Sequence, residues 1–340
     1  MSLIKIVISP STICFLNKMI RQNLAIILLS SITLTACAKS LNNTDQAQTP
    51  ITKQNLSPEQ QKKLQQLLDK TKKNLIEIKG GTFMMGDFGE EKSSDKLPYD
   101  SNADSKPLHK VTLDNFVLSA TKATYADFDV YTEVTGQEKI GKFDELSIQE
   151  RIPNSAAGVN WQQAQNYCQW LGKQLNLKMD LPTEAQWEYA ARNRGQYILY
   201  PTDNGKIDIG RNVWSFEQRQ NQQNNLNAFR NIPELIKFPA TPLGLYDMIT
   251  DNYEWMLDWY DPQYYSKSPE KNPKGPVKGT LKVVRSSIPS EGQTLQSFGG
   301  FTFSRHAIHP VEDPEAAKDK LIKKHHLDLN QNNSVRCAVN

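Results

Sequence analysis

The fold of this 340-residue chain is decided by one stretch, Leu181-Pro182-Thr183-Glu184-Ala185-Gln186-Trp187-Glu188-Tyr189-Ala190-Ala191-Arg192. Thr183 is a good helix N-cap, and Gln186 stands three residues later, which is the spacing of a capping box. Trp187, Ala190 and Ala191 then recur at helical intervals and form an apolar side. The stretch therefore predicts a short helix that is buried on that side.

A second helix is predicted upstream, where Asn160 can act as the N-cap. Trp161, Ala164, Cys168 and Leu171 follow at spacings that place them on one face. The apolar face predicts a helix that packs against the rest of the domain.

Short strands are predicted at residues 75–78, 111–113 and 116–118. After Gly195, aromatic residues and prolines interrupt the sequence at short intervals, so only loops and short strands are expected there. The pattern predicts one α+β domain with limited regular structure, without a second domain or an internal repeat.

Several other short segments stand in order around the first stretch. They are Gly80-Gly81-Thr82-Phe83-Met84-Met85-Gly86, Leu243-Gly244-Leu245-Tyr246-Asp247-Met248, Glu254-Trp255, Asp258-Trp259-Tyr260-Asp261-Pro262, Asn272-Pro273-Lys274-Gly275-Pro276, Val283-Val284-Arg285 and Val335-Arg336-Cys337-Ala338. In this order they resemble the formylglycine-generating enzyme (sulfatase-modifying factor) family, from about Leu75 to Asn340. The resemblance implies a single loop-rich domain with a C-type-lectin-like fold.

The N-terminus has the pattern of a bacterial lipoprotein signal peptide, expected at residues 1–36. An apolar run at residues 24–29 leads to Leu34-Thr35-Ala36-Cys37, so Cys37 is expected to be lipidated. A plain signal peptide and a single membrane helix are the alternatives, although the run is short for a span. The protein is therefore expected to be lipid-anchored in the bacterial envelope and to face the periplasm. The absence of Asp after Cys37 favours the outer membrane by resemblance to enteric lipoproteins.

Residues 37–56 are rich in Asn, Gln and Thr and predict a flexible tether. Residues 57–73 predict an amphipathic helix, with Ser57 as N-cap and Pro58 in the first turn. Leu64, Leu67 and Leu68 give this helix an apolar face that packs on the domain or on a partner. Residues 74–340 then form the domain that resembles the formylglycine-generating enzymes.

The chain has four cysteines, and two of them are expected to remain as thiols. Cys14 leaves with the signal peptide and Cys37 takes lipid. Cys168 and Cys337 remain, in a compartment where disulfides persist. The family pairs a helix cysteine with its terminal one, so the resemblance implies a Cys168–Cys337 disulfide.

Between Arg285 and Pro310 the chain has no cysteine. Family members that oxidise a substrate cysteine hold copper with two cysteines in this stretch, and Cu(I) prefers such soft ligands. No copper is therefore expected, and no catalytic residue is identified. His306, His309, His325 and His326 could assemble a metal site, but surface or hydrogen-bonded histidines are favoured because no carboxylate or cysteine stands at a ligand-like spacing.

A structural calcium ion is the other cofactor that the resemblance raises. Asp251 stands where the family has a calcium-binding Asn, and a carboxylate suits this hard cation. The alternative is that Asp251 caps the next turn. Asn212 begins a segment that resembles the family's other calcium-binding segment, but no downstream Asp completes it.

The resemblance places a substrate cleft beside the missing cysteines. Its residues here would be Arg285, Ser287, Gln293, Phe303, Arg305 and His306. These side chains favour binding a periplasmic protein or peptide, for example as an immunity or accessory protein to an envelope toxin. Arg285 and Arg305 have the alternative role of bracing the core. The alternative function is that of an enzyme of this family with unrecognised chemistry on a peptidic substrate.

The formal net charge is +3, and the basic residues are spread along the chain rather than concentrated in a patch. This distribution excludes nucleic acid as an expected partner. Fold alone does not define function, so the site has to be argued from its own residues.

Overall fold

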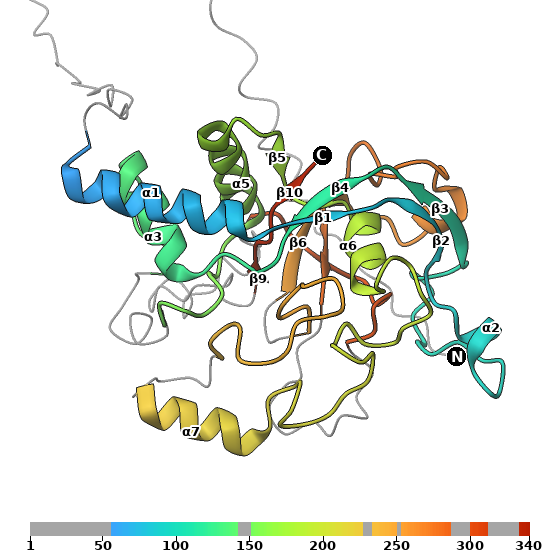
Figure 1. The fold of residues 1–340 in the computed structure, drawn as a ribbon. Helices are drawn as coiled ribbons and strands as arrows, with labels where there is room; N and C mark the ends of the chain where they lie inside the picture. Colours follow the sequence, from blue (N-terminus) through green and yellow to red (C-terminus); the bar gives the residue numbers. More distant parts are fainter. Residues whose placement is uncertain (1–55, 142–150, 227–232, 250–252, 287–299, 312–332) are drawn as a thin grey trace, which may run out of the picture. The chain divides into compact units, whose positions relative to one another are not determined.

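A computed structural model describes residues 56–141, 151–226, 233–249, 253–286, 300–311 and 333–340 of the chain (Figure 1). Within these residues the protein is a mixed α+β domain, as the sequence predicts. None of the helices in the described residues is both long enough and apolar enough to span a bilayer.

The N-terminal helix α1 (Pro58–Lys73) is part of the domain core. Ser57 forms the expected capping box with Gln60. Leu64, Leu67 and Leu68 are buried in one apolar cluster with residues of α3 (Tyr125–Thr135) and α5 (Trp161–Leu175). Of the two alternatives for this helix, the structure shows packing on the domain.

The described strands form three sheets. The first has the order β1 (Leu75–Ile78), β4 (Phe116–Ser119), β10 (Ala338–Val339), β5 (Met179–Asp180), and all of its pairs are antiparallel. The second pairs β2 (Gly81–Met85) with β3 (His109–Leu113). The third has the order β8 (His306–Ile308), β7 (Lys282–Arg285), β6 (Tyr253–Trp259), β9 (Asn333–Ser334), with β9 parallel to β6.

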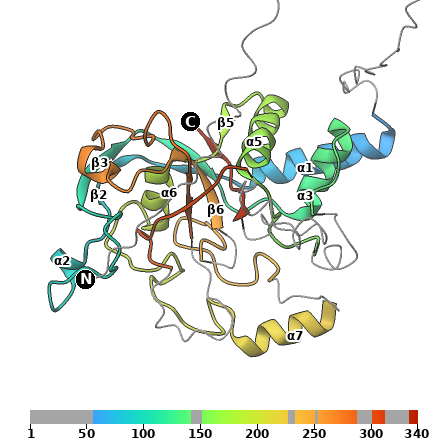
Figure 2. The ribbon, with the colours of Figure 1, turned by 180° about the vertical axis from the view of Figure 1, so that it is seen from behind.

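The helix predicted from the first stretch is α6 (Glu184–Ala191), and Thr183 and Gln186 form its capping box. Trp187 and Ala190 are fully buried in a second apolar cluster, with residues of β2, β3 and β4. Figure 2 shows α6 from behind, close to β2, β3 and β6. The middle of the chain thus supplies the helix around which this cluster is built.

The disulfide implied by the resemblance is present between Cys168 on α5 and Cys337 just before β10. Both residues are buried in the cluster under α1. The bond ties the last strand of the first sheet to the helix layer.

The expectation of only loops and short strands after Gly195 is wrong in one place. Residues Phe216–Leu226 form the helix α7, in which only Arg219 is buried. A helix that is polar on almost every side has no apolar period to detect. Shorter helical turns, α2 (Gly89–Lys92) and η3 (Tyr264–Lys267), complete the described elements.

Candidate functional site

The two arginines expected in the cleft lie inside the domain. Arg285, on β7, is fully buried, and Arg305 is 3% exposed. Arg305 donates through Nε and Nη2 to the two carboxylate oxygens of Glu184, at 2.7 and 2.9 Å. Arg285 donates from Nη1 to Glu184 (2.8 Å) and from Nη2 to Glu188 (3.0 Å). These contacts favour the bracing role over a binding role for both arginines.

Both glutamates come from α6, whose capping box fixes where the helix starts. Glu188 also accepts from Arg192 Nη1 and from the backbone N–H of Gly86, each at 2.9 Å. Arg285 in addition donates to the carbonyl oxygen of Thr302. The network therefore joins α6 to β7, to the loop after β2 and to the segment before β8.

The charges of this network set the ionisation of Glu184. Burial by itself would raise the pKa of Glu184, but the charges of Arg305 and Arg285 lower it below its ordinary value. A buried carboxylate held ionised by two guanidinium groups is a structural element and is not available as a proton carrier at neutral pH.

A second buried network surrounds Glu254 on β6. Arg336 donates from Nε and Nη2 to both of its oxygens (2.8 and 3.0 Å), and Trp187 Nε1 donates to one of them (2.9 Å). The Nζ of Lys122 lies 3.9 Å from the other oxygen. Sequence reasoning missed these roles, because the partners meet only in the folded chain.

An aromatic cluster lies next to the first network. Phe88 and Phe303 are buried at its centre, with ring centroids 5.3 Å apart. Phe301 stacks on Phe303 at 5.2 Å with an interplanar angle of 13°. Tyr99 and Tyr197 also pack on Phe88, at 5.6 and 5.1 Å.

Part of this cluster reaches the surface. Tyr197 is 40% exposed, and Tyr99, Tyr200 and Phe301 are half-buried. We call these four residues the aromatic surface. Tyr and Phe combine a large contact area with few rotatable bonds, which suits them to binding protein segments. Sequence reasoning named only Phe303, the buried member beneath them.

A pocket of about 530 Å³ lies beside this surface, along the loop that follows β2. Its lining comprises Asp87, Glu90, Glu91, Pro98, Lys106, Pro107 and Leu108. The carboxylate of Asp87 already accepts hydrogen bonds from the backbone N–H groups of residues 89, 99 and 100, so it serves the local loop structure. Glu91 accepts from the hydroxyl of Tyr197 at 3.2 Å, which links the pocket to the aromatic surface.

His306 lies half-buried on β8, with its ring 5.0 Å from the ring of Tyr253. Burial and the nearby charge of Arg285 lower the pKa of His306. The ring is therefore neutral near pH 7 and offers a polar edge rather than a cation. Ser287 and Gln293, the other two residues expected in the cleft, lie outside the described residues.

Asn212 is committed to its own loop. Its amide nitrogen donates to the side chains of Asp203 and Asn204 (3.0 and 3.3 Å) and to the carbonyl oxygen of Lys206 (3.0 Å). Its amide oxygen accepts from the backbone N–H of Asp208 at 2.8 Å. Asn212 thus holds the loop together by hydrogen bonds, and Asp251 lies outside the described residues.

Metal ions in proteins are most often bound by clusters of His, Cys, Asp and Glu side chains. The described residues contain no group of three or more such side chains able to hold an ion. Between Arg285 and Pro310 the sequence has no cysteine that could supply a thiolate ligand, which Cu(I) prefers.

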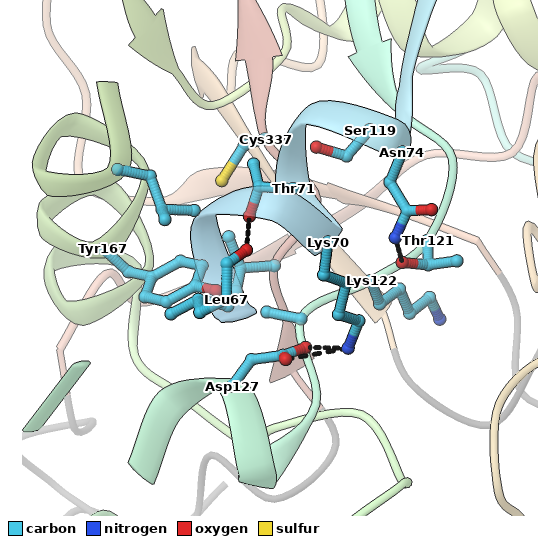
Figure 3. Close-up of a pocket in the computed structure, with 13 residues that line it drawn as sticks. Leu67, Lys70, Thr71, Asn74, Ser119, Thr121, Lys122, Asp127, Tyr167 and Cys337 are labelled. Carbon is cyan, nitrogen blue, oxygen red and sulfur yellow. Dashed lines mark hydrogen bonds and ion pairs between the residues drawn. The ribbon is translucent and has the colours of Figure 1, made fainter. Parts of the chain in front are cut away.

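A small pocket lies under α1, between this helix, α3 and α5 (Figure 3). Its volume of about 30 Å³ admits water but no larger ligand. Lys70 donates to both oxygens of Asp127 at 2.7 Å, and Thr71 donates to the carbonyl oxygen of Leu67. These contacts make the pocket part of the seam that fixes α1 to the domain.

Comparison with known proteins finds similarity to two kinds of relative. The chain is 29% identical over 229 residues to the serine/threonine-protein kinase pkn1 of Chlamydia pneumoniae, covering 62% of this chain and 32% of the kinase. It is 26% identical over 255 residues to the formylglycine-generating enzyme of Mus musculus, covering 62% and 64%. The match thus spans about a third of the first relative and just under two thirds of the second.

The fold comparison agrees with the sequence comparison. The structure of PvdO from Pseudomonas aeruginosa superposes with a TM-score of 0.54 at 21% identity, covering 78% of this chain and 93% of that protein. The sulfatase-modifying factor enzyme 1-like domain family matches residues 60–306. The chain therefore belongs to this family, the FGE-sulfatase domain proteins.

Proposed function

We propose that this protein is a non-catalytic member of its family, which binds a periplasmic protein or peptide through the aromatic surface. The observation that carries the proposal concerns the contacts of Arg285 and Arg305. Both are buried and committed to the carboxylates of α6, in a chain without a cysteine between Arg285 and Pro310. A binding role requires neither thiolates nor a free arginine.

The aromatic surface supports the binding role. Tyr99, Tyr197 and Phe301 rest on a buried base of Phe88 and Phe303. Tyr200 packs on Phe301, so the rings are held in place before a partner arrives. A preorganised surface loses little side-chain entropy on binding. The adjoining pocket adds polar groups that suit recognition of a peptide backbone.

The N-terminal sequence supports a place of action in the bacterial envelope. Leu34-Thr35-Ala36-Cys37 supports a lipid anchor at Cys37, and the tether would give the domain its reach into the periplasm. An immunity or accessory protein for an envelope toxin has this form. Selection of binding peptides can identify the kind of partner directly.

The test is a peptide selection with a matched pair of variants. Peptides are selected from a random displayed library on the wild-type protein, and their affinity is measured by fluorescence anisotropy. Tyr197→Ala with Phe301→Ala is expected to weaken binding by about fivefold or more, the equivalent of roughly 1 kcal/mol.

The control is Phe216→Ala with Ile236→Ala, which removes two exposed apolar side chains outside the aromatic surface. It should leave the affinity unchanged. If the aromatic-surface variant keeps its affinity and melts like wild type, the binding surface lies elsewhere.

A further inference from the structure

The strand β8 forms one edge of the third sheet. It pairs with β7 alone, in antiparallel register, with Ala307 opposite Val283. An edge strand carries backbone N–H and C=O groups on its outer side that its own sheet does not use. What β8 can bind therefore depends on which of its backbone groups point outward.

A hydrogen bond beside β7 fixes these directions. The carbonyl oxygen of Leu281, just before β7, accepts from the N–H of Tyr260, just after β6, at 2.8 Å. The backbone of Leu281 therefore faces β6. Successive residues of a strand direct their backbone groups to alternate sides. Lys282 and Val284 thus face β8, and Val283 faces β6.

The register then assigns each residue of β8. His306 lies opposite Val284 and Ile308 lies opposite Lys282, so both use their backbone groups in the ladder with β7. Ala307 lies between them and directs its N–H and C=O away from the sheet. Among the described residues, no hydrogen bond reaches either group, and Ala307 is half-buried. One donor and one acceptor are thus presented side by side at the edge.

The opposite edge of the same sheet is closed. There the carbonyl oxygen of Asn333, on β9, accepts from the N–H of Val159 at 2.8 Å. Asn333 is 3% exposed and Val159 is fully buried. The chain itself covers this edge, so an added strand has access to the third sheet only beside β8.

The neighbours of Ala307 hold the edge in place and connect it to the aromatic surface. Ile308 packs on the apolar cluster that includes α1, and the ring of His306 lies 5.0 Å from that of Tyr253. Phe301, a member of the aromatic surface, belongs to the segment that leads directly into β8. The edge is therefore a fixed template at the end of that surface.

We propose that the outward N–H and C=O of Ala307 bind an extended peptide segment of the partner, which adds as a strand beside β8 and continues over the aromatic surface. This inference rests on the proposed binding function and specifies its mode. Strand addition recognises any extended backbone, while side-chain contacts select the sequence. The aromatic surface supplies those side-chain contacts.

The size of the edge favours a peptide over a second copy of this chain. Ala307 offers two hydrogen bonds, and β8 is three residues long. Two such strands paired with each other would bury far less than the roughly 1,000 Å² expected of a specific protein interface. A peptide that also covers the aromatic surface adds the missing contact area.

The first test uses a peptide selected on the wild-type protein, as in the binding experiment above. Each backbone nitrogen of the peptide is N-methylated in turn, and the affinity is measured by fluorescence anisotropy. Methylation of the residue that donates to Ala307 should weaken binding tenfold or more. Methylation of its two neighbours, whose N–H groups point away from β8, should have little effect. A series with no such alternation would overturn the strand-addition mode.

The second test follows the protein. The amide of Ala307 should exchange rapidly with solvent in the free protein and at least tenfold more slowly with saturating peptide, while the amide of Leu64 on α1 is unchanged. Slow exchange of Ala307 in the free protein would show that the edge is already covered and would overturn the proposal. A protein that dimerises in sedimentation with this amide protected would assign the edge to a second copy instead.

A matched pair of variants separates the donor from the side chain. Ala307→Pro removes the outward N–H, and proline is tolerated in edge strands at this orientation. It should weaken peptide binding about tenfold. Ala307→Ser keeps the N–H and should bind like wild type. Unchanged affinity in a folded Ala307→Pro protein would contradict the proposal, and the exchange and N-methylation results decide it if that variant does not fold.

The outcomes also separate this inference from the binding function. A peptide that requires Tyr197 and Phe301 but leaves the exchange of Ala307 unchanged would refute strand addition and leave the binding function standing. Slowed exchange of Ala307 in a complex that is insensitive to both aromatic side chains would support strand addition and refute the aromatic surface. A selection that returns no peptide would count against both.

Discussion

Replacement of Glu184 by Gln tests whether the α6 network braces the core. The substitution preserves shape and removes one charge. Glu184 faces Arg285 and Arg305 with both of its oxygens. A glutamine must turn its NH₂ group toward one of these guanidinium groups, so that donor meets donor.

The magnitude follows from what remains after the change. Arg305 would lose the carboxylate that it contacts, and Arg192 and Arg285 would share the carboxylate of Glu188; all three arginines are 3% exposed or less. Removal of one partner from a buried ion pair costs about 3–5 kcal/mol, because the other charge stays buried and unpaired. We expect a loss of this size in the free energy of unfolding.

Urea denaturation at pH 7, followed by circular dichroism, measures the loss. With a slope of about 2 kcal/mol per molar urea, the midpoint should fall by about 1.5–2.5 M. Glu217→Gln, an exposed residue on α7, is the matched control and should shift the midpoint hardly at all. A loss below about 1 kcal/mol in Glu184→Gln would refute the bracing role and reopen Arg285 and Arg305 as binding residues.

The pH dependence of stability at low pH provides an independent check of the same network. The lowered pKa of Glu184 means that its stabilising contribution is present above its ordinary pKa of 4.5 and is lost as the pH falls through the folded value. The wild-type protein should therefore lose stability steeply in acid. In Glu184→Gln the acid slope should be shallower, and an unchanged slope would contradict the assignment.

Three further predictions concern the cysteines and the proposed lack of oxidase chemistry. Cys168→Ser with Cys337→Ser should destabilise the protein by up to about 5 kcal/mol, the chain-entropy value for a loop of this length; a loss below about 1 kcal/mol in thermal or urea unfolding would contradict it. Cys37→Ser should abolish acylation, and wild-type protein without an acyl mass, released from membranes by a mild salt wash, would disprove the lipid anchor. With copper, oxygen and a cysteine-containing sulfatase-type peptide, the protein should form no aldehyde, so any enzyme-dependent loss of the substrate thiol with aldehyde formation would refute the non-catalytic proposal.

The helices that the sequence predicts are those whose signals are local. Ser57, Asn160 and Thr183 each have a capping partner three residues later, and each caps the predicted helix. The helix α7 also has a capping pair, because Ser215 and Gln218 bond each other's backbone N–H, but its many Gln and Asn side chains show no apolar period. Capping and periodicity thus locate α1, α5 and α6, but they gave no prediction of the polar α7, nor of α3, although Thr124 and Asp127 form a capping box there.

The candidate site was less predictable, because its chemistry depends on distant pairs. Glu184 meets Arg285 and Arg305 across 101 and 121 residues of sequence. From the sequence alone, Arg285 and Arg305 could equally bind a partner or brace the core. The aromatic surface has the same origin, since Tyr99, Tyr197 and Phe301 come from three separate segments.

The position of β10 has a consequence for the order in which the protein can be assembled. This strand of two residues, Ala338 and Val339, lies between β4 and β5 and pairs with both. A ribosome that has produced β4 and β5 must still synthesise more than a hundred residues before the strand that joins them exists. The first sheet can therefore close only when synthesis has passed residue 339, and until then its two halves present unpaired edges to chaperones and proteases.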